Sequence, residues 1–310
     1  SGCKAVAFDD DGHQVSQAHR EYATLMPAEG RAELDSALVL DRCLEVITEA
    51  AHACRSTDPV RAIGVSSQGE AFTAVAADGS FLTHAMVSFD TRAAALAQSW
   101  PEEFGRKRLY EITGHTAHPM FTLFKVLWVR DHLPEIWQQT AHVYCFEALL
   151  HLRLGLEPGI SYPLAGRTMM FNVRTHQWDA RILDAAGVRP EQLARVIPAG
   201  GTVGQLSPDT CGGLGLAPGT IVVAGGHDQP CGALGAGVTA PGRAMYGMGT
   251  VECICPAFAS AVFGDGLYQG NLCTYDFTAG GLYTTVAFSL TGGNLLRWYR
   301  DQWGATAEQT

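Results

Sequence analysis

Short apolar runs separated by polar turns fill the first 85 residues of the chain. Residues 5–8 are apolar and lead into the polar residues 9–12, Asp-Asp-Asp-Gly, which is typical of a hairpin turn. Apolar residues at roughly helical spacing predict a helix over residues 35–54. Residues 62–65 and 73–76 each predict a buried strand. Strands that alternate with a long helix indicate an α/β fold.

The same alternation continues through the middle of the chain. Residues 121–130 and 143–154 are apolar runs that predict two helices. A connector rich in Gly and Pro over residues 200–219 leads into a run at 221–224 that predicts another buried strand. Gly225-Gly226 follows at once and predicts a tight turn.

A boundary between two domains is predicted near residue 240. After the Gly-Gly pair, a helix of small residues is expected, with Pro230 in its first turn, where a missing N–H does no harm. A new set of strands begins after Pro241-Gly242. We therefore expect one domain over residues 1–240 and the beginning of a second over residues 241–310.

Composition and charge exclude several classes of protein. With 310 residues, of which 47% are hydrophobic and 17% charged, the chain is expected to fold around a large core. The net charge of −10 and the lack of a Lys/Arg cluster argue against a nucleic-acid partner. The longest uncharged run, residues 277–296, holds four Gly and four Thr, which predicts strand and turn and no membrane span.

Cysteine and lysine usage limits the compartment and the chemistry. The nine cysteines form no Cys-x-x-Cys pair, and we expect reduced core thiols in a cytoplasmic protein. Only three residues are lysines, and no Gly-x-x-x-x-Gly-Lys-Ser/Thr motif is present, which excludes a P-loop NTPase.

Asp228 is the first candidate for chemistry. It follows a predicted strand and two glycines and opens a helix, which is where α/β folds place ligands. Its carboxylate could take a proton from a bound hydroxyl, whereas capping the helix is the structural alternative. Gly249 and Thr250 lie in a glycine-rich turn that suits a phosphate, although Gly-x-Gly is common in ordinary turns.

Two polar pairs are candidates for holding a hydroxylated ligand. Gln68 and Glu70 lie in a turn after a predicted strand, and the alternative is an ordinary strand-end turn. Asp90 and Arg92 share one side of an extended loop, where they either form an internal ion pair or hold a polyol together.

Taken in chain order, these segments resemble the FGGY carbohydrate kinase family. The motifs are dispersed over nearly the whole chain, and their order is more specific than any single motif. The matching segments are Asp11-Gly12 of the first hairpin, residues 64–69, the Trp-x-Asp-x-Arg-like residues 88–92, Lys125-Val126-Leu127-Trp128, the Gly-Gly-x-Asp of residues 225–228, and Gly249-Thr250. The resemblance implies an α/β, ribonuclease H-like (actin-like ATPase) fold, with domain I and the start of domain II present.

The resemblance also implies a reaction, namely ATP-dependent phosphorylation of a hydroxyl of a small sugar or polyol (a pentulose, a deoxyketose or a glycerol-like molecule). Asp228 would be the general base that prepares the hydroxyl for attack on the γ-phosphate of ATP. Mg²⁺ would lie between the phosphates. The residues that would hold substrate hydroxyls are Glu70, Asp90 and Gln229, and these would be supported by Gln68 and Arg92. The residues that would contact the phosphates are Gly249 and Thr250.

The chain departs from the family pattern in ways that leave alternatives open. The family's Asp-x-Gly-Thr phosphate loop and its adenine-binding glycine-rich stretch are not found, so we expect weak phosphoryl transfer from this chain by itself. A catalytically impaired sugar-binding or regulatory protein of the same fold, and an actin-like ATPase acting on a protein partner, are the competing hypotheses. Sugar and ATP are the expected partners, without nucleic acid or membrane, and a homodimer is left open.

Overall fold

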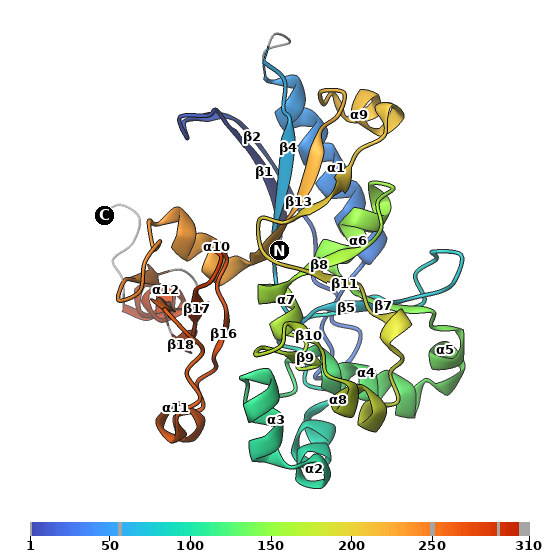
Figure 1. The fold of residues 1–310 in the computed structure, drawn as a ribbon, viewed down its shortest axis with the longest axis vertical. Helices are drawn as coiled ribbons and strands as arrows, with labels where there is room; N and C mark the ends of the chain where they lie inside the picture. Colours follow the sequence, from blue (N-terminus) through green and yellow to red (C-terminus); the bar gives the residue numbers. More distant parts are fainter. Residues whose placement is uncertain (1, 55–57, 249–251, 290–291, 304–310) are drawn as a thin grey trace.

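The computed structural model of the chain describes residues 2–54, 58–248, 252–289 and 292–303. Strands and helices alternate through most of these residues. Figure 1 shows the blue, green and yellow elements as one column, with the orange and red C-terminal elements beside it. This alternation of strands and helices fits the α/β class that the sequence predicts.

A three-stranded sheet leads into two of the candidate site residues, Gln68 and Asp228, which directly follow two of its strands. β4 (Ala62–Ser67) runs parallel to β13 (Ile221–His227), and β12 (Thr202–Gln205) pairs antiparallel with the other edge of β13. The strand predicted at 62–65 is confirmed, but the prediction that it is buried is wrong, because its residues are half-buried or exposed. β4 is an edge strand of this sheet, which leaves one of its sides without a strand partner among the described residues.

The first hairpin and the first long helix match the sequence patterns. β1 (Gly2–Phe8) pairs antiparallel with β2 (Gln14–Glu21), and Gly12 in the turn has a φ of +83°. α1 (Ser36–His52) begins where the Asp35 side chain accepts hydrogen bonds from the amides of the first turn. The hairpin packs on α1 through a small apolar cluster.

A four-stranded antiparallel sheet lies below in the order β3 (Glu33–Leu34), β6 (Ala85–Met86), β5 (Phe72–Val75) and β7 (His142–Cys145). The helix predicted over 143–154 is therefore wrong in its first part, because α6 begins only at Phe146 and ends at Arg153. Residues 143–151 are all buried, so neither strand nor helix periodicity marks the change.

Further helices and short strand pairs make up the rest of the N-terminal elements. The helix predicted at 121–130 is confirmed as α4, whose residues up to Val129 are buried. These elements are α2 (Ala94–Phe104), α3 (Arg106–Thr113), α4 (Thr122–His132), α5 (Pro134–Gln139), α7 (Tyr162–Gly166), α8 (Ala180–Ala186), α9 (Pro208–Leu214), the 3₁₀ turn η1 (Pro190–Gln192), the parallel pair β8 (Gly159–Ser161) with β11 (Arg195–Ile197), and the hairpin β9 (Phe171–Asn172) with β10 (Gln177–Trp178).

The C-terminal elements form a second antiparallel sheet with helices around it. The sheet has the order β14 (Ala244–Met248), β15 (Glu252–Phe258), β17 (Tyr283–Thr284), β16 (Tyr275–Asp276), with β18 (Ala287–Ser289) also on β15. The helices are α10 (Asp228–Gly235), α11 (Asp265–Gln269) and α12 (Gly292–Trp303). Cys253 and Cys255 are both buried in β15, as their spacing predicts for one face of a strand.

Two apolar cores differ in size. The larger extends through both N-terminal sheets, whereas the smaller joins Ala233 and Val238 to residues of β15 and to Phe277.

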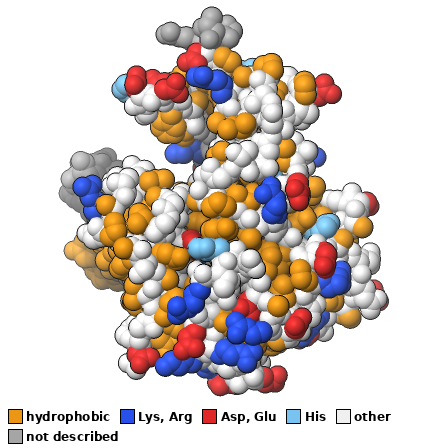
Figure 2. Space-filling model, viewed as in Figure 1, with side chains coloured by type: hydrophobic (Ala, Val, Ile, Leu, Met, Phe, Trp, Pro, Cys, Tyr) orange, Lys and Arg blue, Asp and Glu red, His pale blue; other side chains and the backbone are white. Residues whose placement is uncertain are grey.

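The domain boundary near residue 240 stays a prediction. Figure 2 shows hydrophobic side chains over the C-terminal part of the face it presents. The strands β14, β15 and β18 and the helix α12 expose several large ones, namely Tyr246, Met248, Ile254, Phe288, Leu295, Leu296, Trp298, Tyr299 and Trp303. Among the described residues, no helix has the length and apolar character needed to cross a membrane.

Gly225 and Gly226 lie inside β13, so the tight turn predicted for them is wrong. Their lack of a side chain serves close packing instead. A Cβ placed on Gly225 would lie 1.9 Å from the backbone oxygen of Val65 in β4, and one on Gly226 would lie 2.8 Å from the hydroxyl of Thr278. The pairing of β13 with β4 shifts register between Val223 and Gly226, and this irregular stretch contains Gly225.

Substituting Gly225→Ala should therefore destabilise the fold. The added methyl group meets backbone, which cannot rotate away, so we expect a loss in the free energy of unfolding at or above the upper end of about 1–3 kcal/mol. Gly212→Ala is the matched control, because Gly212 lies in α9 with nothing within 4 Å of its would-be Cβ. There we expect a gain of about 0.5–1 kcal/mol. Urea unfolding measures both, and equal effects would contradict the close-packing explanation.

Candidate active site

A cleft of about 1200 Å³ lies between β1, β4 and the facing side of α1. β1 and β4 belong to different sheets, and the structure shows no ladder between them in the residues it describes. Gln68 and Asp228 both line this cleft, together with Ser66 and Ser67 at the end of β4. The parallel strands β4 and β13 thus bring two predicted site residues, 160 positions apart in sequence, to one end of one cleft.

Asp228 is the first residue of α10, and its carboxylate is about half exposed, at 48%. The N-cap position belongs to His227, so the structural alternative for Asp228 does not apply. Burial of the carboxyl group and the negative charge of Glu70 raise the pKa of Asp228 above its usual value. A half-exposed carboxylate with a raised pKa is suited to accepting a proton from a hydroxyl.

His227 lies directly beside the carboxylate of Asp228. Burial and the positive charge of Arg167 lower the pKa of His227 to about 3, so its ring is neutral at pH 7. Its Nδ1 lies 2.8 Å from the Tyr275 hydroxyl, and its Nε2 lies 3.3 Å from Oδ1 of Asp228. Burial raises the pKa of Tyr275 well above its usual value, so its hydroxyl stays protonated and shares a hydrogen bond with Nδ1 of His227.

Glu70 is buried and paired with Arg167. The Arg167 guanidinium donates to Oε1 of Glu70 from Nε at 2.6 Å and also from Nη2. Burial alone would raise the pKa of Glu70, but the charge of Arg167, together with smaller effects of neighbouring groups and a backbone hydrogen bond, lowers that pKa to about 2. Nη1 of Arg167 lies 3.3 Å from Nε2 of His115, which accepts because the His115 Nδ1, 2.8 Å from the Thr113 oxygen, carries the proton.

The backbone around Glu70 is also fixed. Thr122 and the buried Lys125 donate to the backbone oxygen of Glu70, at 2.9 and 3.3 Å. Burial lowers the pKa of Lys125 to about 8. A Cβ on Gly69 would lie 3.2 Å from the His227 ring, so the turn that carries Gln68 and Glu70 packs directly against the residue beside Asp228.

Asp90 and Arg92 form an internal ion pair. Arg92 donates to both carboxylate oxygens of Asp90, and the amide of Ala32 donates to Oδ2 at 2.7 Å. Burial would raise the pKa of Asp90, but these hydrogen bonds lower it. Arg92 also reaches Glu33 and lies 5.0 Å from the centre of the Trp128 ring. This geometry matches the structural alternative, and a direct contact with substrate stays a prediction.

The remaining predicted residues lie farther along the chain. Gln229 lies in the first turn of α10 and accepts a hydrogen bond from the Cys253 thiol at 2.8 Å, which ties it to β15. Gly249 and Thr250 lie outside the described residues.

Sequence reasoning missed three residues that shape the site, namely Arg167, His227 and Tyr275. Arg167 carried the one available signal, because it is the only charged residue between Glu157 and Arg174 in an otherwise apolar and small-residue stretch.

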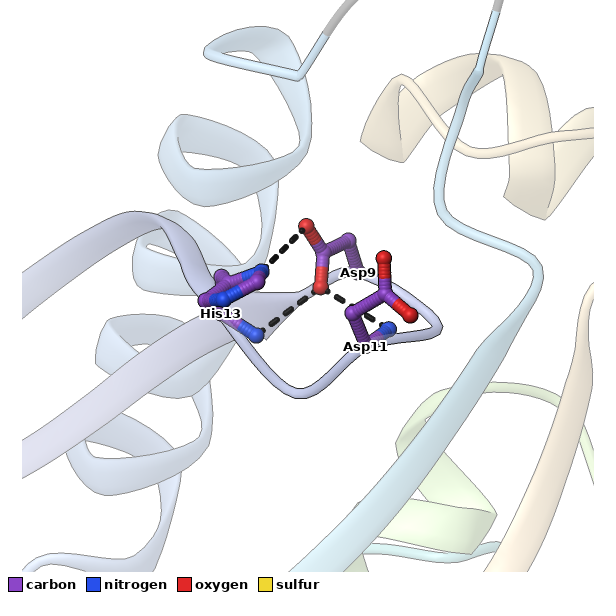
Figure 3. Close-up of side chains that lie close together, drawn as sticks. All are labelled: Asp9, Asp11 and His13. Carbon is purple, nitrogen blue, oxygen red and sulfur yellow. Dashed lines mark hydrogen bonds and ion pairs between the residues drawn. The ribbon is translucent and has the colours of Figure 1, made fainter.

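The tip of the first hairpin holds a cluster of Asp9, Asp11 and His13, whose ligand-type atoms lie within 4.8 Å of one another (Figure 3). The Asp9 carboxylate accepts from the amides of Asp11 and His13 at 3.0 and 2.8 Å and pairs with the His13 ring at 3.3 Å. All three residues are exposed. Asp9 therefore closes the turn, which is an ordinary use of aspartate.

The fold and the site define an α/β protein of the actin-like ATPase type with a carboxylate at the end of its central strand. The family model "FGGY family of carbohydrate kinases, N-terminal domain" matches residues 1–235. The chain belongs to this family.

Named relatives agree with this assignment. The chain is 24% identical over 301 residues to a xylulose kinase of Bacillus subtilis and 28% identical over 308 residues to an L-fuculokinase of Salmonella typhi. These alignments cover 97% and 96% of the chain but 60% and 63% of the relatives, so the chain spans about 60% of the length of the relatives it matches. A xylulose kinase structure from Rhodospirillum rubrum has a TM-score of 0.91 at 21% identity, covering 99% of this chain and 62% of that one. That likeness concerns the fold.

Proposed function

We propose that the chain is the sugar-binding part of a carbohydrate kinase that phosphorylates a hydroxyl of a small sugar or polyol, with Asp228 as general base. The observation that carries the proposal is the position of Asp228, half exposed at the start of α10 and lining the same cleft as Gln68. Phosphoryl transfer needs positioning and charge stabilisation more than covalent help from the protein, and a fixed carboxylate that receives the hydroxyl proton fits this requirement.

Substrate hydroxyls would contact Glu70, Gln68 and Gln229. Among the described residues, the side-chain hydrogen bonds to Glu70 all go to Oε1, which leaves Oε2 to accept from a hydroxyl. Gln68 lines the cleft beside Asp228, and the Gln229 side chain hydrogen-bonds the Asp228 carboxylate. Asp90 and Arg92 would support this region through Trp128 and α4, without requiring contact with the sugar.

ATP is the proposed phosphoryl donor, and Mg²⁺ would supply charge neutralisation between its phosphates. The proposed phosphate contacts, Gly249 and Thr250, lie outside the described residues. We therefore assign this chain's described residues only to binding the acceptor, orienting the base and holding the proton at Asp228.

The relatives that the chain matches include a xylulose kinase, a gluconokinase, a glycerol kinase and an L-fuculokinase. We propose an uncharged pentulose or polyol as substrate. Two buried positive side chains around Glu70, those of Arg167 and Lys125, are already bound to Glu70 and to backbone oxygens, so the described residues leave no unbound cation there to pair with an acidic sugar.

A screen of the complete gene product with ATP, Mg²⁺ and a panel of acceptors tests the proposal. We expect phosphate transfer to at least one neutral pentulose or polyol and little transfer to gluconate. ATP hydrolysis stimulated only by a protein partner would contradict the proposal and favour the actin-like ATPase. Sugar binding without transfer would favour the impaired, regulatory alternative.

Domain limits of 1–240 and 241–310 remain part of the proposal, and limited proteolysis with cleavage near residue 240 would support them.

A further inference from the structure

A buried carboxylate outside the cleft joins two strands that lead into the site. Glu147, on α6, is fully buried. Its Oε1 accepts from the Gly225 amide in β13 at 2.9 Å, and its Oε2 accepts from the Ser161 amide at the end of β8 at 2.6 Å. The structure shows no ion pair for Glu147 within the ranges it describes.

The two amides belong to different sheets. β13 pairs with β4 and β12, whereas β8 pairs with β11. Gly225 lies at the register shift of β13 against β4, where a ladder partner is missing. The carboxylate of Glu147 takes the place of that ladder bond and at the same time binds the edge of β8. A buried amide without an acceptor would cost about 1–3 kcal/mol, so this bridge determines where both strands lie.

Each of the two strands, β13 and β8, leads along the chain to one part of the site. Three residues after Gly225 the chain reaches Asp228, the proposed base. Six residues after Ser161, through α7, it reaches Arg167, which holds Glu70. The distance between the proposed base and the proposed substrate-binding carboxylate is therefore set by segments that Glu147 ties together.

We infer that Glu147 is a positioning residue that fixes the separation between Asp228 and the Arg167–Glu70 pair. This inference rests on the proposed kinase function. Two amide donors face the two oxygens of Glu147, and a carboxylate satisfies both, whereas the amide group of a glutamine would direct an N–H against one of them. Burial raises the pKa of Glu147 to about 7, so the chain keeps this acid at a cost in stability.

The test compares Glu147→Gln with Asp179→Asn in the complete gene product. Asp179 is likewise a buried carboxylate that accepts from two backbone amides, those of Arg181 and Ile182, but it caps α8 and belongs to neither strand. Steady-state kinetics with the best acceptor from the screen are measured well below the unfolding temperature of each variant. We expect E147Q to lower kcat by about tenfold or more and to raise the KM for the acceptor, because small displacements of reacting groups are costly. D179N should lose stability and keep both kinetic constants.

The outcomes separate the inference from the function on which it rests. No transfer by the wild-type protein would overturn the proposed function. Wild-type activity with unchanged kcat and KM in E147Q would overturn the positioning role and leave the function standing. Equal kinetic losses in E147Q and D179N would also overturn it, because they would reflect the loss of any buried carboxylate. If E147Q does not fold, Glu147→Asp, which keeps the charge but is one methylene shorter, is measured instead. Normal kinetics in E147D, or failure of both variants to fold, would overturn the inference.

Discussion

Asp228→Asn is expected to abolish most phosphoryl transfer by the complete gene product, with kcat falling by about 10²–10⁴-fold, the usual contribution of a general base. Asparagine keeps the size of the side chain and its place in the first turn of α10, but it cannot take up the hydroxyl proton. The acceptor should still bind, because Gln68 and Glu70 remain in place. Binding is measured on the isolated chain by tryptophan fluorescence or calorimetry, and turnover by coupled ADP release.

The stability of the same variant is expected to hold or increase, although its activity falls. Because the pKa of Asp228 is raised in the folded state, its ionised form costs stability at pH 7. D228N removes that cost, so its free energy of unfolding should equal or exceed that of the wild type. Asp265→Asn is the matched control, since Asp265 is exposed and pairs only with Lys107 in the described structure. Normal turnover in D228N, or loss of turnover caused by unfolding, would remove Asp228 from the proposed mechanism.

Local signals explain which elements the sequence predicts correctly. The turn at Gly12 and the helix predicted over residues 35–54 depend on residues that are near one another in sequence, and both are confirmed. The change from β7 to α6 at Cys145 and Phe146 was missed because the surroundings bury every side chain there, which hides the alternation of exposure that distinguishes a strand from a helix. Gly225 was misread because the need for a glycine comes from Val65, a distant neighbour in sequence.

The site shows the same division between local and long-range information. Asp228 could be predicted from its own segment, since a strand end followed by a helix start is a local feature. The partner of Glu70 could not, because Arg167 lies 97 positions away and only the packing of α7 against the sheets brings them together. The same holds for the bridge from Glu147 to Ser161 and Gly225. The order of the motifs nevertheless indicated the family, because several weak local signals in a fixed order restrict the fold more than one strong signal.

Arg167→Met is expected to cause the largest loss of stability among substitutions at the site. It leaves Glu70 buried without its partner, and removing one member of a buried ion pair costs about 3–5 kcal/mol. Arg106→Met is the control, because the pair of Arg106 with Glu102 is largely exposed and its loss should cost about 0–1 kcal/mol. Urea unfolding at pH 7 measures both variants.

The pH dependence decides whether the charge of Arg167, and not only its bulk, stabilises the fold. In the wild type the pKa of Glu70 is lowered from 4.5 to about 2, so its contribution is complete above pH 4.5 and is lost as the pH falls toward 2. R167M removes the main charge that opposes burial, which leaves burial against the smaller effects of Lys125 and a backbone hydrogen bond. We expect burial to dominate and to raise the pKa of Glu70 above 4.5, which reverses the sign, so that stability is lost as the pH rises through the new pKa. R167M should therefore approach the wild type as the solution is acidified, and Glu70→Gln in the R167M background should recover part of the loss at pH 7. A constant difference between the two proteins from pH 4 to 7, about the range over which a buried carboxyl titrates, would show that packing alone accounts for the effect.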